Sequence, residues 1–130
     1  MIIFSDTAGL VSLFSEKDSN HRQAMRIVKK LKGQSFLISK YIFAEVVTML
    51  SQKEGKEKSI IVGEHLKTKY EWIDLNTEIE NLAWKIFKKQ TSKNISFIDC
   101  TTIALYKDGA FDKLFTFDSD FKKNKVAILE

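Results

Sequence analysis

The stretch "MIIFSDTAGLVSLF", Met1–Phe14, decides the fold class because it places a strand directly before a helix. "MIIF" is typical of a short buried strand, and "TAGLVSLF" predicts a helix that begins just after Ser5 and Asp6. The same alternation of apolar runs and amphipathic segments continues to the end of the chain. Strands that alternate with helices predict an α/β protein with a parallel sheet covered on both faces.

Further strands are expected at "SFLIS", "YEWIDL" and "KLFTF", with "VAIL" near the C-terminus as a short fifth strand. Helices are expected over "HRQAMRIVKKLK", "YIFAEVVTMLSQ", residues 57–69, and two segments that begin at Asn76 or Thr77 and at Ser96. We expect Ser19 to cap the first of these helices and Gly33 to end it. The prediction is a three-layer α/β/α fold with a central parallel sheet of four to five short strands, in a single domain over residues 1–130.

The composition is that of a folded protein without a membrane or secretory signal. Hydrophobic residues make up 44% of the chain, with no Pro and only 5 Gly, which excludes a disordered chain of low complexity. No apolar run approaches the ~18 residues that span a bilayer, and the N-terminus lacks a basic leader segment, so we expect a cytoplasmic protein. The single cysteine, Cys100, has apolar and hydroxyl neighbours, and we interpret it as a buried packing residue.

The net charge of +4 comes mostly from lysine clusters such as "VKKLK" and "DFKKNK". Lysines bind phosphate groups, but they also occur on ordinary solvated helix surfaces. The charge alone is therefore a weak sign of nucleic-acid binding, and an acidic metal site in the same chain would strengthen it.

Acidic residues follow two of the expected strands. Asp6 comes directly after the first strand, and Asp118 and Asp120 in "TFDSDF" come after the fourth. In an open parallel sheet, ligands bind at the carboxyl ends of the strands, near the point where the strand order reverses. Each of these residues alone has a simpler use as a helix cap or turn residue, and that alternative stays open.

Three carboxylates stand alone in segments that carry no other charge. Asp6 is the only charged residue in positions 1–15, Glu45 in positions 41–52 and Asp99 in positions 94–106. Such segments are expected to be buried, where a carboxylate is costly unless it is paired, hydrogen-bonded or bound to a cation. A simpler role stays open for two of these residues. Glu45 lies off the apolar stripe of its helix, where a solvated side chain needs no partner. Asp99 has capping-box spacing from Ser96, which offers it a purely structural role in capping the helix.

Taken together, Asp6, Glu45, Asp99 and Asp118 are expected near one edge of one sheet. Carboxylates that are brought together repel one another and resist ionisation unless a divalent cation neutralises them. Oxygen ligands without a His-Cys cluster favour Mg²⁺ or Mn²⁺ over structural zinc.

The order and spacing of these acids resemble the PIN-domain nucleases and, within them, the VapC-type toxins of bacterial toxin-antitoxin pairs. The matching residues are Asp6 in "FSDTAGL", Glu45 in "FAEVVTML", Asp99 in "SFIDCTTIA" and Asp118 in "TFDSDF". "NHRQAM" and Thr116 add to the similarity, which covers nearly the whole chain. Ala8 stands where the family often has a hydroxyl residue, and Asp120 stands where many members have histidine.

The resemblance implies a metal-dependent endoribonuclease. Mg²⁺ or Mn²⁺ would be held by Asp6, Asp99 and Asp118, while Glu45 would bind the metal through water or help to position the attacking water. Asp120 would support these ligands without binding the metal. The resemblance also implies an RNA substrate, a homodimer and a cognate antitoxin that wraps the toxin. His21 is expected to be a structural or dimer-interface residue.

Two functions of other classes remain open. A PIN-like domain that binds RNA or a protein without cleaving would have no need of acids at all four positions. A small-molecule phosphoryl-transfer protein, such as a receiver or phosphatase, should carry its Asp-x-Asp pair after the first strand. Here "DSD" follows the fourth strand, and the chain has no Gly-rich phosphate loop.

Overall fold

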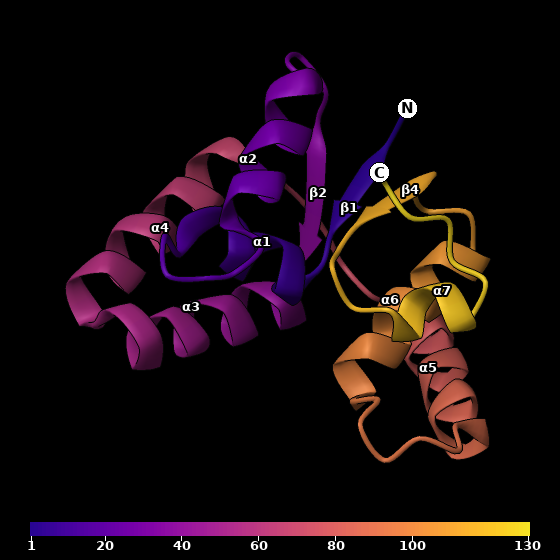
Figure 1. Ribbon diagram of the computed structural model, residues 1–130. Helices are drawn as coiled ribbons and strands as arrows, with labels where there is room; N and C mark the ends of the chain where they lie inside the picture. Colours follow the sequence, from indigo (N-terminus) through magenta and orange to yellow (C-terminus); the bar gives the residue numbers. More distant parts are fainter.

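The computed structural model describes residues 1–130, in which strands and helices alternate (Figure 1). The strands are β1 (Ile3–Ser5), β2 (Phe36–Ser39), β3 (Glu71–Ile73) and β4 (Lys113–Phe115). The helices are α1 (Thr7–Phe14), α2 (His21–Lys30), α3 (Lys40–Glu54), α4 (Lys56–Lys69), α5 (Thr77–Lys89), α6 (Phe97–Lys107) and α7 (Asp120–Lys123). None of the helices combines the length and the apolar character needed to cross a lipid bilayer.

The strands form one parallel sheet in the order β3-β2-β1-β4. The chain moves outward from β1 through β2 to β3, and then returns to add β4 on the other side of β1. The strand order therefore reverses between β1 and β4, whose last residues, Ser5 and Phe115, are paired. In open parallel sheets this reversal point, at the carboxyl ends of the strands, is where ligands bind.

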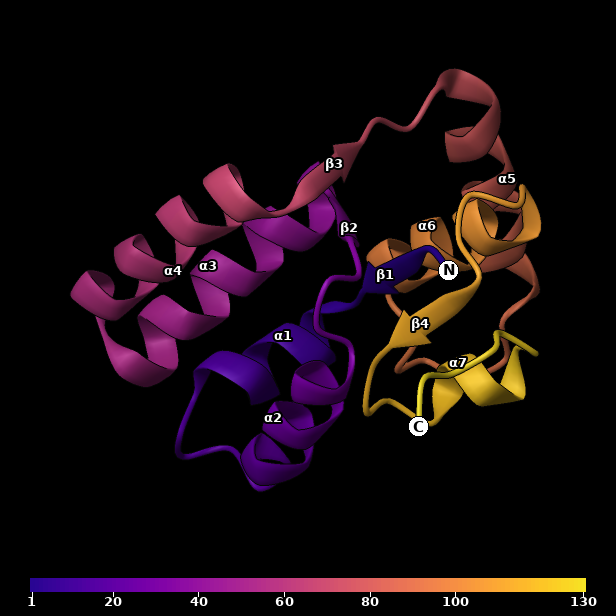
Figure 2. The ribbon, with the colours of Figure 1, turned by 90° about the horizontal axis from the view of Figure 1, so that it is seen from above.

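Helices cover both faces of the sheet, which confirms the predicted three-layer α/β/α fold. In both views α1 to α4 lie on one side of the strands, and α5, α6 and α7 lie on the other (Figure 1 and Figure 2). On one side α3 packs along α4, and on the other α5 packs along α6. Apolar side chains fill the space between the layers, among them the fully buried Phe4, Ile38 and Leu114, and their removal from water stabilises the fold.

The first helix approaches the end of β4 so closely that a side chain at position 9 has no room. A Cβ at Gly9 would lie 2.4 Å from the carbonyl oxygen of Phe115 and 2.9 Å from its ring atom Cδ2. With no side chain there, the backbone of α1 rests directly on the end of β4. This contact brings Asp6, at the start of α1, beside the residues that follow β4.

The expected fifth strand was wrong. The segment around "VAIL" meets β4 at one isolated bridge, between Leu114 and Ile128. There the N–H of Leu114 donates to the carbonyl of Ala127, and the N–H of Leu129 donates to the carbonyl of Leu114. Strand β4 is only 3 residues long, and successive residues of a strand direct their N–H and C=O groups to opposite edges. Only its middle residue, Leu114, therefore offers these groups to the C-terminal segment, and no longer strand pairing forms.

Helix α2 begins at His21 as expected, but its capping residue and its end differ from the prediction. Asn20, and not Ser19, is the residue before the helix, and its side chain forms no capping bond. In the loop before the helix, Asp18 Oδ1 accepts the N–H of Asn20 at 2.9 Å. The helix ends at Lys30, and Gly33 lies beyond it in the following turn, where its φ of 87° favours glycine.

Candidate active site

Asp6 lies in the turn between β1 and α1, where the strand order reverses. Its N–H donates to the carbonyl of Phe115 at 3.0 Å, and its Oδ2 accepts the N–H of Ala8 at 3.3 Å as the N-cap of α1. The hydroxyl of Thr116, directly after β4, donates to the same Oδ2 at 2.9 Å. The ends of the neighbouring strands β1 and β4 therefore hold the Asp6 carboxylate in one position.

The carboxyl group of Asp6 is buried, and only one of its oxygens is satisfied. The residue is 2% exposed, and its Oδ1 has no hydrogen-bond partner. Burial and, after it, the negative charge of Asp99 raise the pKa of Asp6 to about 7, from an ordinary value of 3.8. An unpartnered carboxylate oxygen inside a protein is costly unless a proton or a cation satisfies it.

Asp99 lies in the first turn of α6, where it forms the predicted capping box with Ser96. The N–H of Ser96 donates to Asp99 Oδ2 at 3.0 Å, and the N–H of Asp99 donates to the Ser96 hydroxyl at 3.0 Å. Burial, joined by the negative charges of Asp118 and Glu45, raises the pKa of Asp99 to about 6. Asp99 thus caps its helix and also lies within the electrostatic reach of the other acids.

Glu45 reaches the site from α3. Its carboxylate is half-buried, and its Oε1 accepts a hydrogen bond from the hydroxyl of Thr7. It is therefore not merely a solvated residue on a polar helix face. Sequence reasoning missed Thr7, whose only local signal is a hydroxyl residue at the start of a helix, directly after Asp6.

Asp118 lies in the loop between β4 and α7. Its N–H donates to the Thr116 hydroxyl oxygen at 3.1 Å, so one side chain connects Asp118 to Asp6. Its Oδ1 accepts the N–H of Asp120 at 2.9 Å. The carboxylate of Asp120 lies 3.7 Å from Lys123 Nζ within α7, so Asp120 contacts the site through its backbone.

Asp99 lies within electrostatic reach of the other three acids. The charge of Asp99 acts on Asp6, and the charges of Asp118 and Glu45 act on Asp99. No basic side chain compensates them. The ion pairs of the chain join Lys53 to Asp18, Lys122 to Glu130 and Lys123 to Asp120.

The chemistry of this group fits a hard divalent cation. Its donors are carboxylate oxygens, which Mg²⁺ and Mn²⁺ prefer. No three His, Cys, Asp or Glu side chains form a cluster that could hold a metal ion by themselves. Mg²⁺ does not require one, because it keeps several waters and is usually held by one or two carboxylates together with substrate phosphates. The unpartnered Oδ1 of Asp6 fits as one such ligand.

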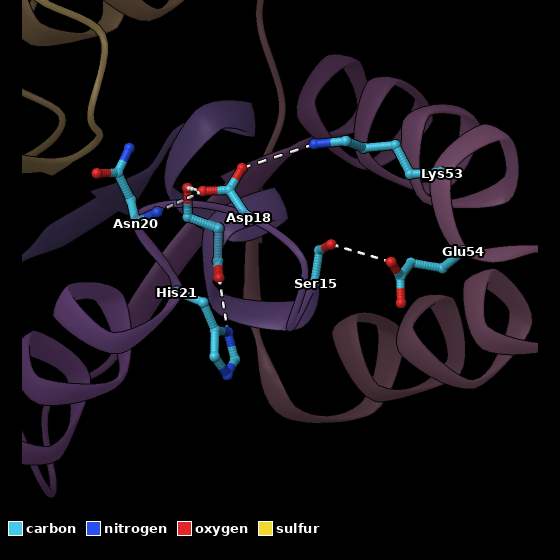
Figure 3. Close-up of polar contacts among 7 residues, drawn as sticks. Ser15, Asp18, Asn20, His21, Lys53 and Glu54 are labelled. Carbon is cyan, nitrogen blue, oxygen red and sulfur yellow. Dashed lines mark hydrogen bonds and ion pairs between the residues drawn. The ribbon is translucent and has the colours of Figure 1, made fainter.

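His21 and Cys100 lie outside the acidic group. The Nδ1 atom of His21 lies 2.9 Å from the carbonyl oxygen of Ser12, and a carbonyl can only accept, so the ring nitrogen donates (Figure 3). Beside it, the ion pair of Asp18 and Lys53, at 3.6 Å, connects the loop before α2 to α3. His21 therefore has a structural role, which is one of the two roles expected for it. Cys100 is buried, as predicted.

Comparison with known proteins points to one family. Residues 3–127 match the family described as PIN domain. The chain is 24% identical, over 121 residues and 92% of each chain, to the "23S rRNA-specific endonuclease VapC20" of Mycobacterium tuberculosis.

Solved structures share the fold. VapC20 of M. tuberculosis, described as a "Sarcin-Ricin loop cleaving toxin", has a TM-score of 0.85 at 22% identity over 96% of both chains. FitAcB of Neisseria gonorrhoeae has a TM-score of 0.73 at 16% identity, covering 100% of this chain and 97% of the other. VapBC2 of Rickettsia felis, bound to a DNA fragment from their promoter, has a TM-score of 0.70 at 19% identity, covering 100% and 98%.

Proposed function

Because this chain belongs to the PIN-domain family, we propose that it is a divalent-cation-dependent endoribonuclease and the toxin of a toxin-antitoxin pair. The observation that carries the proposal is the uncompensated group of acids around Asp99, which includes a buried Asp6 oxygen without a partner. A domain that only binds RNA gains nothing from such a concentration of negative charge, because it repels phosphate.

In this proposal Asp6, Asp99 and Asp118 hold Mg²⁺ or Mn²⁺. When bound, such an ion polarises a phosphate oxygen and lowers the pKa of a bound water. Asp6 and Asp99 would bind the ion as carboxylates, so protons would compete with it at pH values below their pKa values of about 7 and about 6.

The chain's own hydrogen bonds orient these groups. The hydroxyl of Thr116 and the first turn of α1 hold Asp6, and Ser96 holds Asp99. Glu45, whose Oε1 accepts from Thr7, would bind the cation through water or orient the attacking water. Side chains that are already held in place do not have to reorganise during the reaction, which is a main source of enzymatic rate enhancement.

RNA is the proposed substrate class. The relative VapC20 is named for its action on 23S rRNA, so ribosomal RNA is the first substrate to test. The excess of lysine, with a net charge of +4, favours binding to a phosphate backbone.

We also propose a homodimer and a cognate antitoxin, as the resemblance to VapC-type toxins implies, and action as a single nuclease domain in the cytoplasm. The fold shared with VapBC2 and FitAcB supports a protein partner.

The test is cleavage of purified ribosomal RNA by the purified protein in Mg²⁺, in Mn²⁺ and in EDTA. We expect discrete fragments with either ion and none in EDTA. Asp6→Asn should slow cleavage at least ~100-fold, which corresponds to about 3 kcal/mol of transition-state stabilisation. Glu57→Gln, a change to an exposed carboxylate in the first turn of α4, is the control and should cleave like the parent.

Two results would contradict the proposal. Cleavage by Asp6→Asn at the parental rate would mean that the acidic group is not the active site. RNA binding without cleavage in any of these ions would favour the PIN-like binding domain.

A further inference from the structure

A surface of aromatic side chains extends from the acidic site across α5. We call it the aromatic shelf, and it consists of Tyr41, Phe97, Trp84 and Phe87. Trp84 is 52% exposed, and the other three are partly buried. The proposed chemistry of the acids does not use these side chains.

The shelf is continuous from α3 to α5. The rings of Trp84 and Phe87 are stacked, with centroids 5.6 Å apart and an interplanar angle of 18°. The centroid of the Phe97 ring lies 6.3 Å from that of Trp84 and 6.3 Å from that of Tyr41. α5 and α6, which carry three of the rings, lie side by side on one side of the sheet (Figure 1 and Figure 2).

The inner end of the shelf borders the acids. Phe97 and Asp99 share the first turn of α6. Tyr41 precedes Glu45 by one helical turn on α3, so the two side chains lie on the same side of that helix. The hydroxyl of Tyr41 donates to Glu80 at 2.7 Å, which fixes the ring. The same helical segments that carry these acids therefore also carry two rings of the shelf.

The outer end of the shelf carries unpaired lysines. Trp84 and Phe87 line a cavity of about 350 Å³ together with Lys88 and Lys93. Neither lysine takes part in an ion pair. Aromatic faces for bases and cations for phosphates are the two components of single-strand recognition. A protein interface is instead depleted of charge at its centre.

We propose that the aromatic shelf stacks an unpaired base of the RNA beside the cleavage site, with Trp84 as the exposed stacking surface and with Lys88 and Lys93 binding the adjoining backbone. The inference rests on the proposed nuclease function, since it names how the same site holds its substrate. Trp84 is thus a positioning residue, which determines how tightly an unpaired segment is held.

The test is binding of a fluorescein-labelled single-stranded oligoribonucleotide of mixed sequence, measured by fluorescence anisotropy in EDTA, where no cleavage occurs. Trp84→Ala should weaken binding roughly 5- to 100-fold, the range expected for loss of one stacked base. Trp84→Phe keeps an aromatic face and should restore most of the affinity. Trp72→Ala is the matched control, because Trp72 is the other tryptophan, is 39% exposed and lies on β3, where its ring packs on Phe43 and not on a ring of the shelf.

The lysines have a separate readout. Lys88→Gln should reduce the slope of the logarithm of affinity against the logarithm of salt concentration by about 0.7, as expected for one phosphate contact on a single strand. An unchanged slope in both Lys88→Gln and Lys93→Gln would remove the lysines from the proposed binding surface.

The outcomes separate this inference from the nuclease proposal. Equal RNA affinity of Trp84→Ala and the parent would overturn it, and so would a parent that binds no RNA. A Trp84→Ala variant that turns a dimer into a monomer in sedimentation, with RNA affinity unchanged, would assign the shelf to a second copy of the chain.

If the parent cleaves RNA and Trp84→Ala has the parental KM and kcat, the proposed role of the shelf is wrong and the nuclease proposal stands. If the parent binds RNA through Trp84 but never cleaves it, the shelf stands and the nuclease fails.

Discussion

Thr116 and Asp6 lie 110 positions apart in the chain, and the hydroxyl of Thr116 donates a hydrogen bond of 2.9 Å to Oδ2 of Asp6. The same hydroxyl oxygen accepts the N–H of Asp118 at 3.1 Å. One side chain thus joins the acids that follow the neighbouring strands β1 and β4, at the point where the strand order reverses.

Thr116→Val tests this connection, because it keeps the shape of the side chain and removes the hydroxyl. Asp6 Oδ2 would retain only the N–H of Ala8, and the N–H of Asp118 would lose its partner. We expect the free energy of unfolding to fall by about 1–3 kcal/mol, measured by urea denaturation at a pH of about 8, where Asp6 is ionised. Thr116→Ser keeps the hydroxyl and should lose much less; equal losses in the two variants would exclude the hydrogen bond as the cause.

The buried acids predict that the protein without a cation becomes less stable as the pH rises. The pKa of Asp6 is about 7 and that of Asp99 about 6 in the folded protein, above the ordinary value of 3.8. At pH values between the ordinary pKa and the folded pKa, the folded state binds more protons than the unfolded state. The stabilisation that this gives is complete below the ordinary pKa, and it is lost as the pH rises through the folded pKa values. Between a pH of about 5 and about 8, in EDTA, we expect the free energy of unfolding to fall by about 2–4 kcal/mol.

Asp6→Asn is the control for this pH dependence. The variant removes the carboxyl with the larger shift, so its stability should change less over the same range and should exceed that of the parent at the upper end. Urea denaturation at both pH values measures the difference. A parent whose stability is the same at both, or a variant with the parental dependence, would show that burial of Asp6 does not control it.

Gly9→Ala tests the close approach of α1 to β4. The added Cβ would lie 2.4 Å from the Phe115 carbonyl oxygen, a backbone atom that cannot rotate away. This overlap should outweigh the gain in helix propensity of about 1 kcal/mol and lower the free energy of unfolding by about 1–3 kcal/mol.

Gly63→Ala is the matched control for Gly9→Ala, because Gly63 is also a helical glycine in contact with another element. A Cβ there would lie 3.2 Å from Cγ1 of Val47, a side-chain atom that can shift. We expect its effect on stability to stay within about 1 kcal/mol. If urea denaturation gave the same change for both glycines, the contact between α1 and β4 would not be as tight as the structure has it.

Local rules predicted much of the site from the sequence. The position of Asp6 follows from the end of an apolar strand, and that of Asp118 from the end of another. The capping box of Ser96 and Asp99 needs residues only three positions apart, and it is present as predicted. Parallel strands place their carboxyl ends together, so the closeness of Asp6 and Asp118 also followed from the alternation of elements.

Contacts between distant segments were not predictable in this way. Thr7 and Glu45 are 38 positions apart, and nothing local distinguishes a solvated Glu45 from one held by a hydroxyl on another helix. The strand-like composition of "VAIL" gave no information on the length of its partner β4, which limits pairing to one bridge. The aromatic shelf likewise depends on how α5 packs against α6.

A calorimetric titration with Mn²⁺ tests most directly the central claim that acids from separate elements bind one cation. The proteins to compare at a pH of about 7.5 are the parent, Asp99→Asn and, as a control, Asp74→Asn, a change to an exposed carboxylate between β3 and α5. We expect saturable binding in the parent and the control, and binding that is lost or at least ~10-fold weaker in Asp99→Asn, because ligand charge sets affinity at such sites. Equal affinity in the parent and Asp99→Asn, or no saturable binding in the parent at millimolar Mn²⁺, would contradict the claim.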